Sequence, residues 1–245
     1  MAAVKQPRLR VMTYNIRSGR GADDRVDLGR IAEVIGSYDP DVVALQEVDC
    51  GRERSGSVDQ AAALGERLGM AASFAPCVED GGARYGIATL SRLPVVTSRQ
   101  VGLPHRANLP RSEPRCALLT RLAWSGDRTI DLVNTHLSVL RGERPAQVAA
   151  IGSAIAGRDL ILAGDLNCTA RSGAFRTLSA GLRSATRRAR SWPARLPIVQ
   201  IDHILYRGSL AVVTAGAWTA GPARRASDHL PVVAELALAS EEIAA

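Results

Sequence analysis

Lysine is almost absent from this chain of 245 residues. Lys5 is its single lysine, so 30 of the 31 basic residues are arginines, and the formal net charge is +7. Such a skew is typical of arginine-favouring, GC-rich coding rather than of selection for binding to phosphate backbones. The basic charge therefore raises the expectation of an anionic substrate only modestly, and it does not by itself predict a nucleic-acid partner.

Paired cysteines and long apolar segments are lacking as well. The four cysteines, Cys50, Cys77, Cys116 and Cys168, show no spacing that is typical of a metal site. Because no secretory signal accompanies them, we expect reduced thiols. No apolar run approaches the length that spans a membrane, and no apolar signal segment precedes the first predicted strand. We therefore expect a cytoplasmic protein without a transmembrane segment.

Core-forming residues, in contrast, are plentiful. Hydrophobic residues make up 46% of the chain and charged residues 22%, which is typical of a soluble globular protein. No linker or break in composition divides the chain. We therefore predict a single domain over residues 1–245, with its core at about residues 9–238, and expect a monomer.

Apolar runs of strand length alternate with amphipathic segments along the chain. Strands are predicted at residues 9–16, 42–48, 70–76, 86–90, 95–103, 115–124, 130–137, 160–167, 198–206, 210–219 and 230–238. Helices are predicted at residues 27–37, 60–68, 143–156 and 172–182. A strand-helix-strand unit thus occurs twice, ending at residues 48 and 167. This repetition predicts two α/β layers packed sheet against sheet, with both sets of strand ends at one rim.

The run LILAGDLN at residues 160–167 places polar groups where a buried strand stops. The period of two in a strand puts Asp165 and Asn167 on the same side of the extended chain. For a lone Gly-Asp-x-Asn, an Asx-type turn that opens the next helix is the alternative. We favour a functional strand end, because four other apolar strands carry polar residues at matching positions.

Those residues are Asn15, Glu47, His136 and the adjacent pair Asp228 and His229. Taken singly, each has an ordinary structural explanation: Asn15 could cap a strand end, and a histidine such as His136 is often merely hydrogen-bonded. Their occurrence as an ordered set is the stronger signal.

Taken together, these motifs resemble the endonuclease/exonuclease/phosphatase superfamily, the metal-dependent phosphoesterases of the DNase I and exonuclease III kind. Residues 85–94, YGIATLSRLP, are similar to the Gly-x-Ala-Ile-Leu-Ser-Arg-x-Pro segment of that family. The motifs follow in order and span residues 9–238. The resemblance implies an α/β (α+β) fold, a four-layer α/β/β/α sandwich in which two packed mixed β-sheets are flanked by helices.

A magnesium site is also implied by the resemblance, with Mn²⁺ as a substitute for Mg²⁺. Glu47 is expected as the first ligand, with Asn15 as an amide ligand or an orienting residue. Asp228 is expected near the metal or the attacking water. Magnesium prefers oxygen ligands and keeps several waters, so that one or two carboxylates suffice.

The carboxylate expected to orient and deprotonate the attacking water is Asp165. Asn167 is expected to help, and its amide can also donate to the phosphate. The resemblance places His229 on the phosphate. Asp202 matches the aspartate that pairs with this histidine and raises its basicity.

Two further residues are expected at the phosphate. The resemblance implies that His136 contacts it or acts as general acid for the leaving oxygen. Arg115 could touch phosphate too, and an Arg–carboxylate pair is the equal alternative. His203 should face the opposite side of its strand from Asp202, and His105 has no motif around it, so neither is assigned to the site.

The sequence therefore predicts a metal-dependent phosphoesterase that hydrolyses a phosphodiester or phosphomonoester bond by attack of an activated water. A small molecule or a lipid headgroup is the favoured substrate. A repair or non-specific DNA endonuclease or exonuclease is the alternative, and the arginine-rich segment 184–197 suits nucleic acid or a phospholipid headgroup. The aromatic-rich segment of abasic-site endonucleases is missing before Asp202. A non-catalytic phosphate-binding relative is the alternative outside enzymes, and the intact residue set disfavours it.

Overall fold

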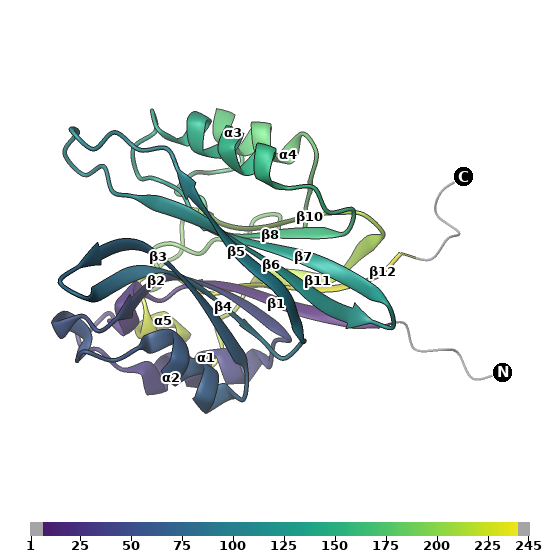
Figure 1. The fold of residues 1–245 in the computed structure, drawn as a ribbon. Helices are drawn as coiled ribbons and strands as arrows, with labels where there is room; N and C mark the ends of the chain where they lie inside the picture. The colour runs from purple at the N-terminus through teal and green to yellow at the C-terminus, as the bar shows by residue number, and fades with distance from the viewer. Residues whose placement is uncertain (1–6, 240–245) are drawn as a thin grey trace.

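Two six-stranded mixed sheets pack face to face in the computed structural model, which describes residues 7–239. Helices cover the outer face of each sheet, so that four layers are stacked (Figure 1). The predicted α/β/β/α sandwich is thereby confirmed. Within the described residues, no helix is both long enough and apolar enough to cross a bilayer.

The first sheet contains, in spatial order, β11 (Leu210–Ala217), β12 (Val232–Leu238), β1 (Arg8–Asn15), β2 (Val42–Cys50), β4 (Ala83–Ser91) and β3 (Ala71–Asp80). The second sheet contains β5 (Val95–Leu103), β6 (Arg115–Ser125), β7 (Arg128–His136), β8 (Leu160–Asp165), β10 (Asp202–Arg207) and β9 (Arg183–Ser184). The first sheet is covered by α1 (Leu28–Tyr38), α2 (Gln60–Leu68) and the short α5 (Ala223–Ala226), and the second by α3 (Arg144–Ala154) and α4 (Gly173–Ser179). Two 3₁₀ turns, η1 (Arg17–Gly19) and η2 (Glu53–Ser55), follow β1 and β2.

The two halves of the chain repeat one arrangement. β1 and β2 run parallel with α1 between them in sequence, and β7 and β8 run parallel with α3 between them. An antiparallel strand flanks each pair on either side: β12 and β4 in the first sheet, β6 and β10 in the second. Equivalent strand ends from both sheets therefore meet at one rim, at the end of the sandwich away from the start of β1 (Figure 1).

Local signals explain where most helices begin. Asp27, Asp59 and Ser172 precede α1, α2 and α4, and the side chain of each accepts a hydrogen bond from the backbone N–H three residues on. Pro145 lies in the first turn of α3, where its missing N–H costs nothing. The helix α5 and the two-residue strand β9 were not predicted, because elements of four and two residues carry no readable periodicity.

Two predicted strand boundaries were wrong. The strand predicted at residues 160–167 ends at Asp165, and the strand predicted at residues 198–206 begins at Asp202. In both places an apolar sequence continues beyond the strand: Leu166 lies in the apolar cluster beneath α3 and α4, and its N–H donates to the carbonyl of Ile201 at 2.9 Å. The strands predicted at 70–76 and 86–90 are longer than expected, because Gly81 and Gly82 adopt positive φ and close a tight two-residue turn between them.

A polar cluster lies in the otherwise apolar space between the sheets. Asn134 of β7 is fully buried, and its amide donates to the backbone carbonyls of Leu45 and Ala88 in the opposite sheet, at 3.0 and 2.8 Å. Gln46 of β2 donates to Asn134 Oδ1 at 2.8 Å and to Thr13 Oγ1 at 3.1 Å. These bonds fix the position of one sheet against the other more specifically than apolar contacts do.

We expect Asn134→Ala to lower the free energy of unfolding by about 2–4 kcal/mol, because it removes three buried hydrogen bonds and leaves a small cavity. Urea denaturation of the purified protein measures this change. Thr129→Ala, at an exposed position of the same strand, is the control and should change stability by no more than about 0.5 kcal/mol. Equal stability of the two variants would contradict a tethering role for Asn134.

Candidate active site

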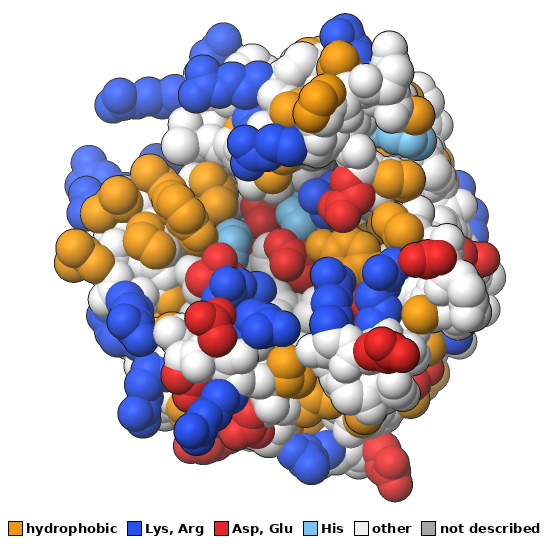
Figure 2. Space-filling view, turned by 90° about the vertical axis from the view of Figure 1, so that its left-hand side faces the viewer, with side chains coloured by type: hydrophobic (Ala, Val, Ile, Leu, Met, Phe, Trp, Pro, Cys, Tyr) orange, Lys and Arg blue, Asp and Glu red, His pale blue; other side chains and the backbone are white. Residues whose placement is uncertain are grey.

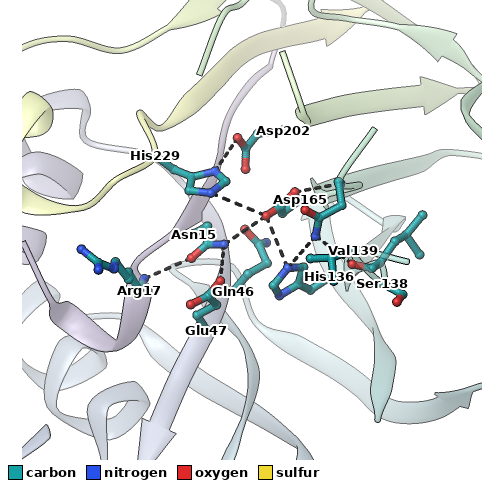
Figure 3. Close-up of polar contacts among 12 residues, drawn as sticks. Asn15, Arg17, Gln46, Glu47, His136, Ser138, Val139, Asp165, Asp202 and His229 are labelled. Carbon is teal, nitrogen blue, oxygen red and sulfur yellow. Dashed lines mark hydrogen bonds and ion pairs between the residues drawn. The ribbon is translucent and has the colours of Figure 1, made fainter. Parts of the chain in front are cut away.

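The rim of the sandwich is hollowed, and acidic and imidazole side chains gather in the hollow with arginines around it (Figure 2). The predicted site residues converge there from both sheets. The close-up shows Asn15 and Glu47 from the first sheet, His136, Asp165 and Asp202 from the second, and His229 from the segment before β12 (Figure 3). The interactions among them are hydrogen bonds and ion pairs, described below.

Asn15, the last residue of β1, joins the two sheets. Its Nδ2 donates to Glu47 Oε1 at 2.9 Å and to Asp165 Oδ2 at 3.0 Å (Figure 3). Its Oδ1 accepts from the backbone N–H of Arg17 at 3.1 Å, which fixes the orientation of the amide. This geometry shows Asn15 orienting both carboxylates, and its amide oxygen keeps a second lone pair that could bind a cation.

Glu47 stands on a distorted part of β2. The register with β4 shifts between Gln46 and Val48, and Glu47 adopts a φ of 56°, in the left-handed region that non-glycine residues rarely occupy. Burial raises the pKa of Glu47, with an opposing contribution from the hydrogen bond of Asn15 and a further rise from the charge of Asp228. A strained backbone that holds a desolvated carboxylate is a feature of functional sites.

Asp165 and Asn167 are close to one another, but not because they share one side of a strand. β8 ends at Asp165, and Asn167 adopts a φ of 48° and donates its backbone N–H to Asp165 Oδ1 at 2.8 Å. This is the Asx-type turn that was the alternative at the sequence level, and here it forms part of the site. Asn167 Nδ2 also donates to the carbonyl of Leu137 at 2.9 Å. Position 164 requires glycine, because a Cβ there would lie 2.0 Å from the carbonyl oxygen of Thr135 in β7.

Asp202, His229 and Asp165 form a buried chain of charges. His229 Nδ1 lies 2.9 Å from Asp202 Oδ2, and its Nε2 lies 3.8 Å from Asp165 Oδ2. Burial opposes the charged imidazolium, but Asp202 and Asp165 outweigh it and raise the pKa of His229 to about 10. Burial, together with the charge of Asp202, raises the pKa of Asp165 to about 7. His229 is therefore an imidazolium at neutral pH, and its Nε2 lies beyond hydrogen-bond distance of Asp165.

His136 has the opposite character. Burial and the neighbouring charges of Arg115 and His229 hold the pKa of His136 well below its ordinary value, so the ring is neutral. Arg115 Nη1 lies 2.8 Å from His136 Nδ1, while His136 Nε2 lies 3.0 Å from Asn167 Nδ2 and 3.3 Å from Asp165 Oδ2. Arg115 also pairs with Glu113 at 2.8 Å. Arg115 thus forms the carboxylate pair that was the alternative to a site contact, and it also contacts His136 of the site.

Two groups of side chains could hold a cation. Ligand atoms of Asp165, Asp202 and His229 lie within 4.8 Å of one another, but the imidazolium already balances much of the negative charge there. Glu47 and Asp228 differ, because within residues 7–239 neither is paired with a cationic side chain within 4.0 Å. Their hydrogen bonds come only from the neutral side chains of Asn15 and Ser227. The charge of Asp228 contributes to the raised pKa of Glu47, and carboxylate oxygens suit a hard cation.

Two serines that the sequence reasoning did not assign support the site from behind. Ser191 Oγ donates to Asp202 Oδ2 at 2.5 Å, and Ser227 Oγ donates to the carbonyl of Asn15 at 2.8 Å. The N–H of His229 in turn donates to Ser227 Oγ at 3.3 Å. Ser227 adjoins the Asp-His pair and could have been suspected, but nothing in the sequence links Ser191 to Asp202. As predicted, His203 faces away, bonded to the carbonyl of Cys168, and His105 lies exposed in a loop.

Comparisons with known proteins identify the family and the fold. Residues 12–229 match the family described as "Endonuclease/Exonuclease/phosphatase family". The chain belongs to this family. Its fold resembles that of a family protein from Beutenbergia cavernae, with a TM-score of 0.74 and 26% identity over 96% of this chain and 72% of that one.

Two further solved structures with a similar fold come from named proteins. The human Nocturnin catalytic domain has a TM-score of 0.72 and 23% identity, with 95% of this chain and 94% of that chain covered. A mannosyl-6-phosphatase from Bacteroides thetaiotaomicron has a TM-score of 0.74 and 20% identity, with 94% and 100% covered. No curated protein sequence matches the chain significantly. The family comprises nucleases and phosphatases, so membership supports a hydrolase of phosphoester bonds.

We expect Asp202→Asn to lower the pKa of His229 from about 10 by more than about 1 unit in the metal-free protein. Burial favours the neutral ring, and the variant removes the negative charge that opposes this effect most strongly. An NMR titration of the histidine ring signals measures the change. Asp131→Asn is the control, because Asp131 pairs with Arg121 near the opposite end of β7. A His229 pKa that is the same in both variants would contradict the assigned pairing.

Proposed function

We propose that this family member is a metal-dependent phosphoesterase that cleaves its substrate by attack of an activated water. The observation that carries the proposal is the amide of Asn15, which donates to Glu47 at 2.9 Å and to Asp165 at 3.0 Å. It thereby joins Glu47, which forms no ion pair among residues 7–239, to the chain of Asp165, His229 and Asp202. Phosphoester hydrolysis needs a cation, a base for the water and donors for the phosphate, and these groups supply a candidate for each.

Mg²⁺ is the cation that the donor set suits best, with Mn²⁺ as a substitute, and Glu47 and Asp228 would hold it. When bound, it would offset the charge of the phosphate and lower the pKa of a bound water. Asn15 would keep the carboxylates of Glu47 and Asp165 in place through its two donated hydrogen bonds.

Asp165 is the proposed base for the attacking water. Its raised pKa of about 7 makes it a suitable proton acceptor near neutral pH. His229 would donate from Nε2 to the phosphate as an imidazolium, and Asp202 would keep it charged and oriented. The ring of His136 would help to position Asp165, which it approaches to 3.3 Å, and its neutral state disfavours it as the general acid. Asn167 and Arg115 are proposed as further donors near the phosphate.

A small molecule or a lipid headgroup remains the proposed substrate, with DNA as the alternative. The segment 184–197 borders the site, because Ser191 contacts Asp202 and the N–H of Ala194 donates to the carbonyl of Asp228. It exposes apolar side chains there: Leu196 is 73% exposed, and nearby Ile198 is 59% exposed. A protein surface that binds DNA is polar and strongly basic, so this apolar rim disfavours DNA. Plasmid cleavage at physiological salt that is lost when Arg187, Arg188 and Arg190 are changed to Ala would favour the nuclease instead.

We expect EDTA to abolish hydrolysis of bis-p-nitrophenyl phosphate and Mg²⁺ to restore it. Glu47→Gln should raise the Mg²⁺ concentration for half-maximal activity by at least about tenfold, because it removes one charged ligand. Titration of activity with Mg²⁺ measures this. Glu66→Gln, on the exposed face of α2, should leave the requirement unchanged. Full activity in EDTA would exclude the proposed mechanism.

We expect Asp165→Asn to lower kcat by about 10²–10⁴-fold with little change in KM, because it removes the base but keeps the shape of the side chain. The wild-type rate should fall as the pH drops to 7 or below, since Asp165, whose pKa is about 7, then becomes protonated. A bound cation would shift this fall to lower pH. Steady-state kinetics measure both effects, with Asp127→Asn at an exposed turn as the control. A variant with wild-type kcat would assign the base elsewhere.

A further inference from the structure

A cavity of about 690 Å³ opens beside Asn167, on the side of the second sheet. Its walls come from the loop after β7, the start of α3, the loop after β8 and the segment before β10. The volume lies within the range of small-molecule binding sites, roughly 300–1,000 Å³. None of the roles proposed above uses this cavity, apart from the shared Asn167.

The cavity is positively charged. Arg141, Arg144 and Arg171 line it, and no lining residue is acidic. Within residues 7–239, none of the three forms an ion pair with a carboxylate within 4.0 Å. Arg144 is only 8% exposed, and it donates from Nε to the carbonyl of Ser138 at 2.7 Å and from Nη2 to that of Val139 at 2.8 Å. A buried guanidinium held by neutral carbonyls keeps its full charge available to a ligand.

The electrostatics of Arg144 point the same way. Burial lowers the pKa of Arg144, and the like charge of Arg141 lowers it further, while Cys168 and Asp165 raise it. An anion in the cavity would relieve both unfavourable effects. A phosphate is the anion whose geometry matches several guanidinium groups at once.

The remaining walls combine aliphatic and small polar side chains, and none of them is aromatic. The aliphatic ones are Val139, Pro145, Ala174, Val199 and Ile201, and the polar ones include Asn167, Thr169 and Ser172. Proteins that hold a nucleobase usually stack it on an aromatic ring. The walls therefore suit an aliphatic scaffold such as a sugar or another polyol better than a base.

We propose that this cavity binds a second phosphate of the substrate, carried on a polyol, while the phosphate to be cleaved lies at Asp165 and His229. The inference rests on the proposed function, because it takes the hollow next to Asn167 as the place of hydrolysis. The polyol could be free or could be the headgroup of a lipid, since both offer the same pair of phosphates to the arginines.

The double variant Arg141→Ala/Arg171→Ala tests the proposal. Both arginines are exposed, so their removal should leave the fold intact, whereas Arg144 also ties down a loop and is left unchanged. The matched control is Arg128→Ala/Arg158→Ala, which removes the same charge next to the opposite ends of β7 and β8.

In Mg²⁺, we expect the double variant to raise KM for fructose 1,6-bisphosphate at least about tenfold, with kcat for bis-p-nitrophenyl phosphate unchanged. The control should change neither. Vesicles that contain cardiolipin, whose glycerol carries two phosphates, form the lipid arm, and preferential cleavage of one substrate identifies the source of the polyol. Equal KM values in the double variant and the wild type would overturn the proposal, as would preferred cleavage of adenosine 3′,5′-bisphosphate.

Calorimetric binding of fructose 1,6-bisphosphate in EDTA separates this inference from the proposed function. Binding that weakens at least about tenfold in the double variant, but not in the control, supports the cavity even if no ester is hydrolysed. Binding of equal strength in all three proteins, or no binding to any of them, would overturn the cavity even if Mg²⁺-dependent hydrolysis of bis-p-nitrophenyl phosphate is found.

Discussion

The amide of Asn15 is the contact on which the arrangement of the site depends. One nitrogen donates to a carboxylate of its own sheet, Glu47, and to a carboxylate of the opposite sheet, Asp165. Without a shared donor, two desolvated carboxylates so placed would repel each other and separate the strand ends. The bond from Arg17 N–H to the amide oxygen sets which way the amide points, so that the donor cannot turn away.

Further polar bonds extend this constraint into the fold. Asn134 fixes the sheets against each other deep in the sandwich, while Ser191 and Ser227 attach the segments that deliver Asp202 and His229. Each bond is buried, where an unpaired partner costs more than a hydrogen bond gains. Such bonds hold catalytic groups in one position more sharply than apolar packing does. The relative position of the two sheets is therefore determined most sharply by the polar bonds at which they meet.

This arrangement strains the backbone and desolvates charged side chains. Glu47 and Asn167 both occupy the left-handed region, and both are held there by the site they serve: Glu47 at the bulge of β2 and Asn167 in the turn closed by Asp165. Burial raises the pKa of both Glu47 and Asp165, and the charges of Asp228 and Asp202 respectively raise them further. A bound cation would offset the negative charge of these carboxylates.

The sequence by itself determined the layers, the two strand-helix-strand units and the identity of the polar residues at the strand ends. These follow from apolar periodicity, from caps such as Asp27 and Asp59, and from the ordered motifs that resemble the family. Tertiary structure alone decided how those residues act. The two-residue periodicity of a strand does not predict that Asn167 contacts Asp165 through a turn, or that Ser191 contacts Asp202. Both contacts depend on how a loop is held in the folded protein. Nor could the sequence tell the charged His229 from the neutral His136, since neighbours from other strands, Asp202 and Arg115, set the charge of each ring.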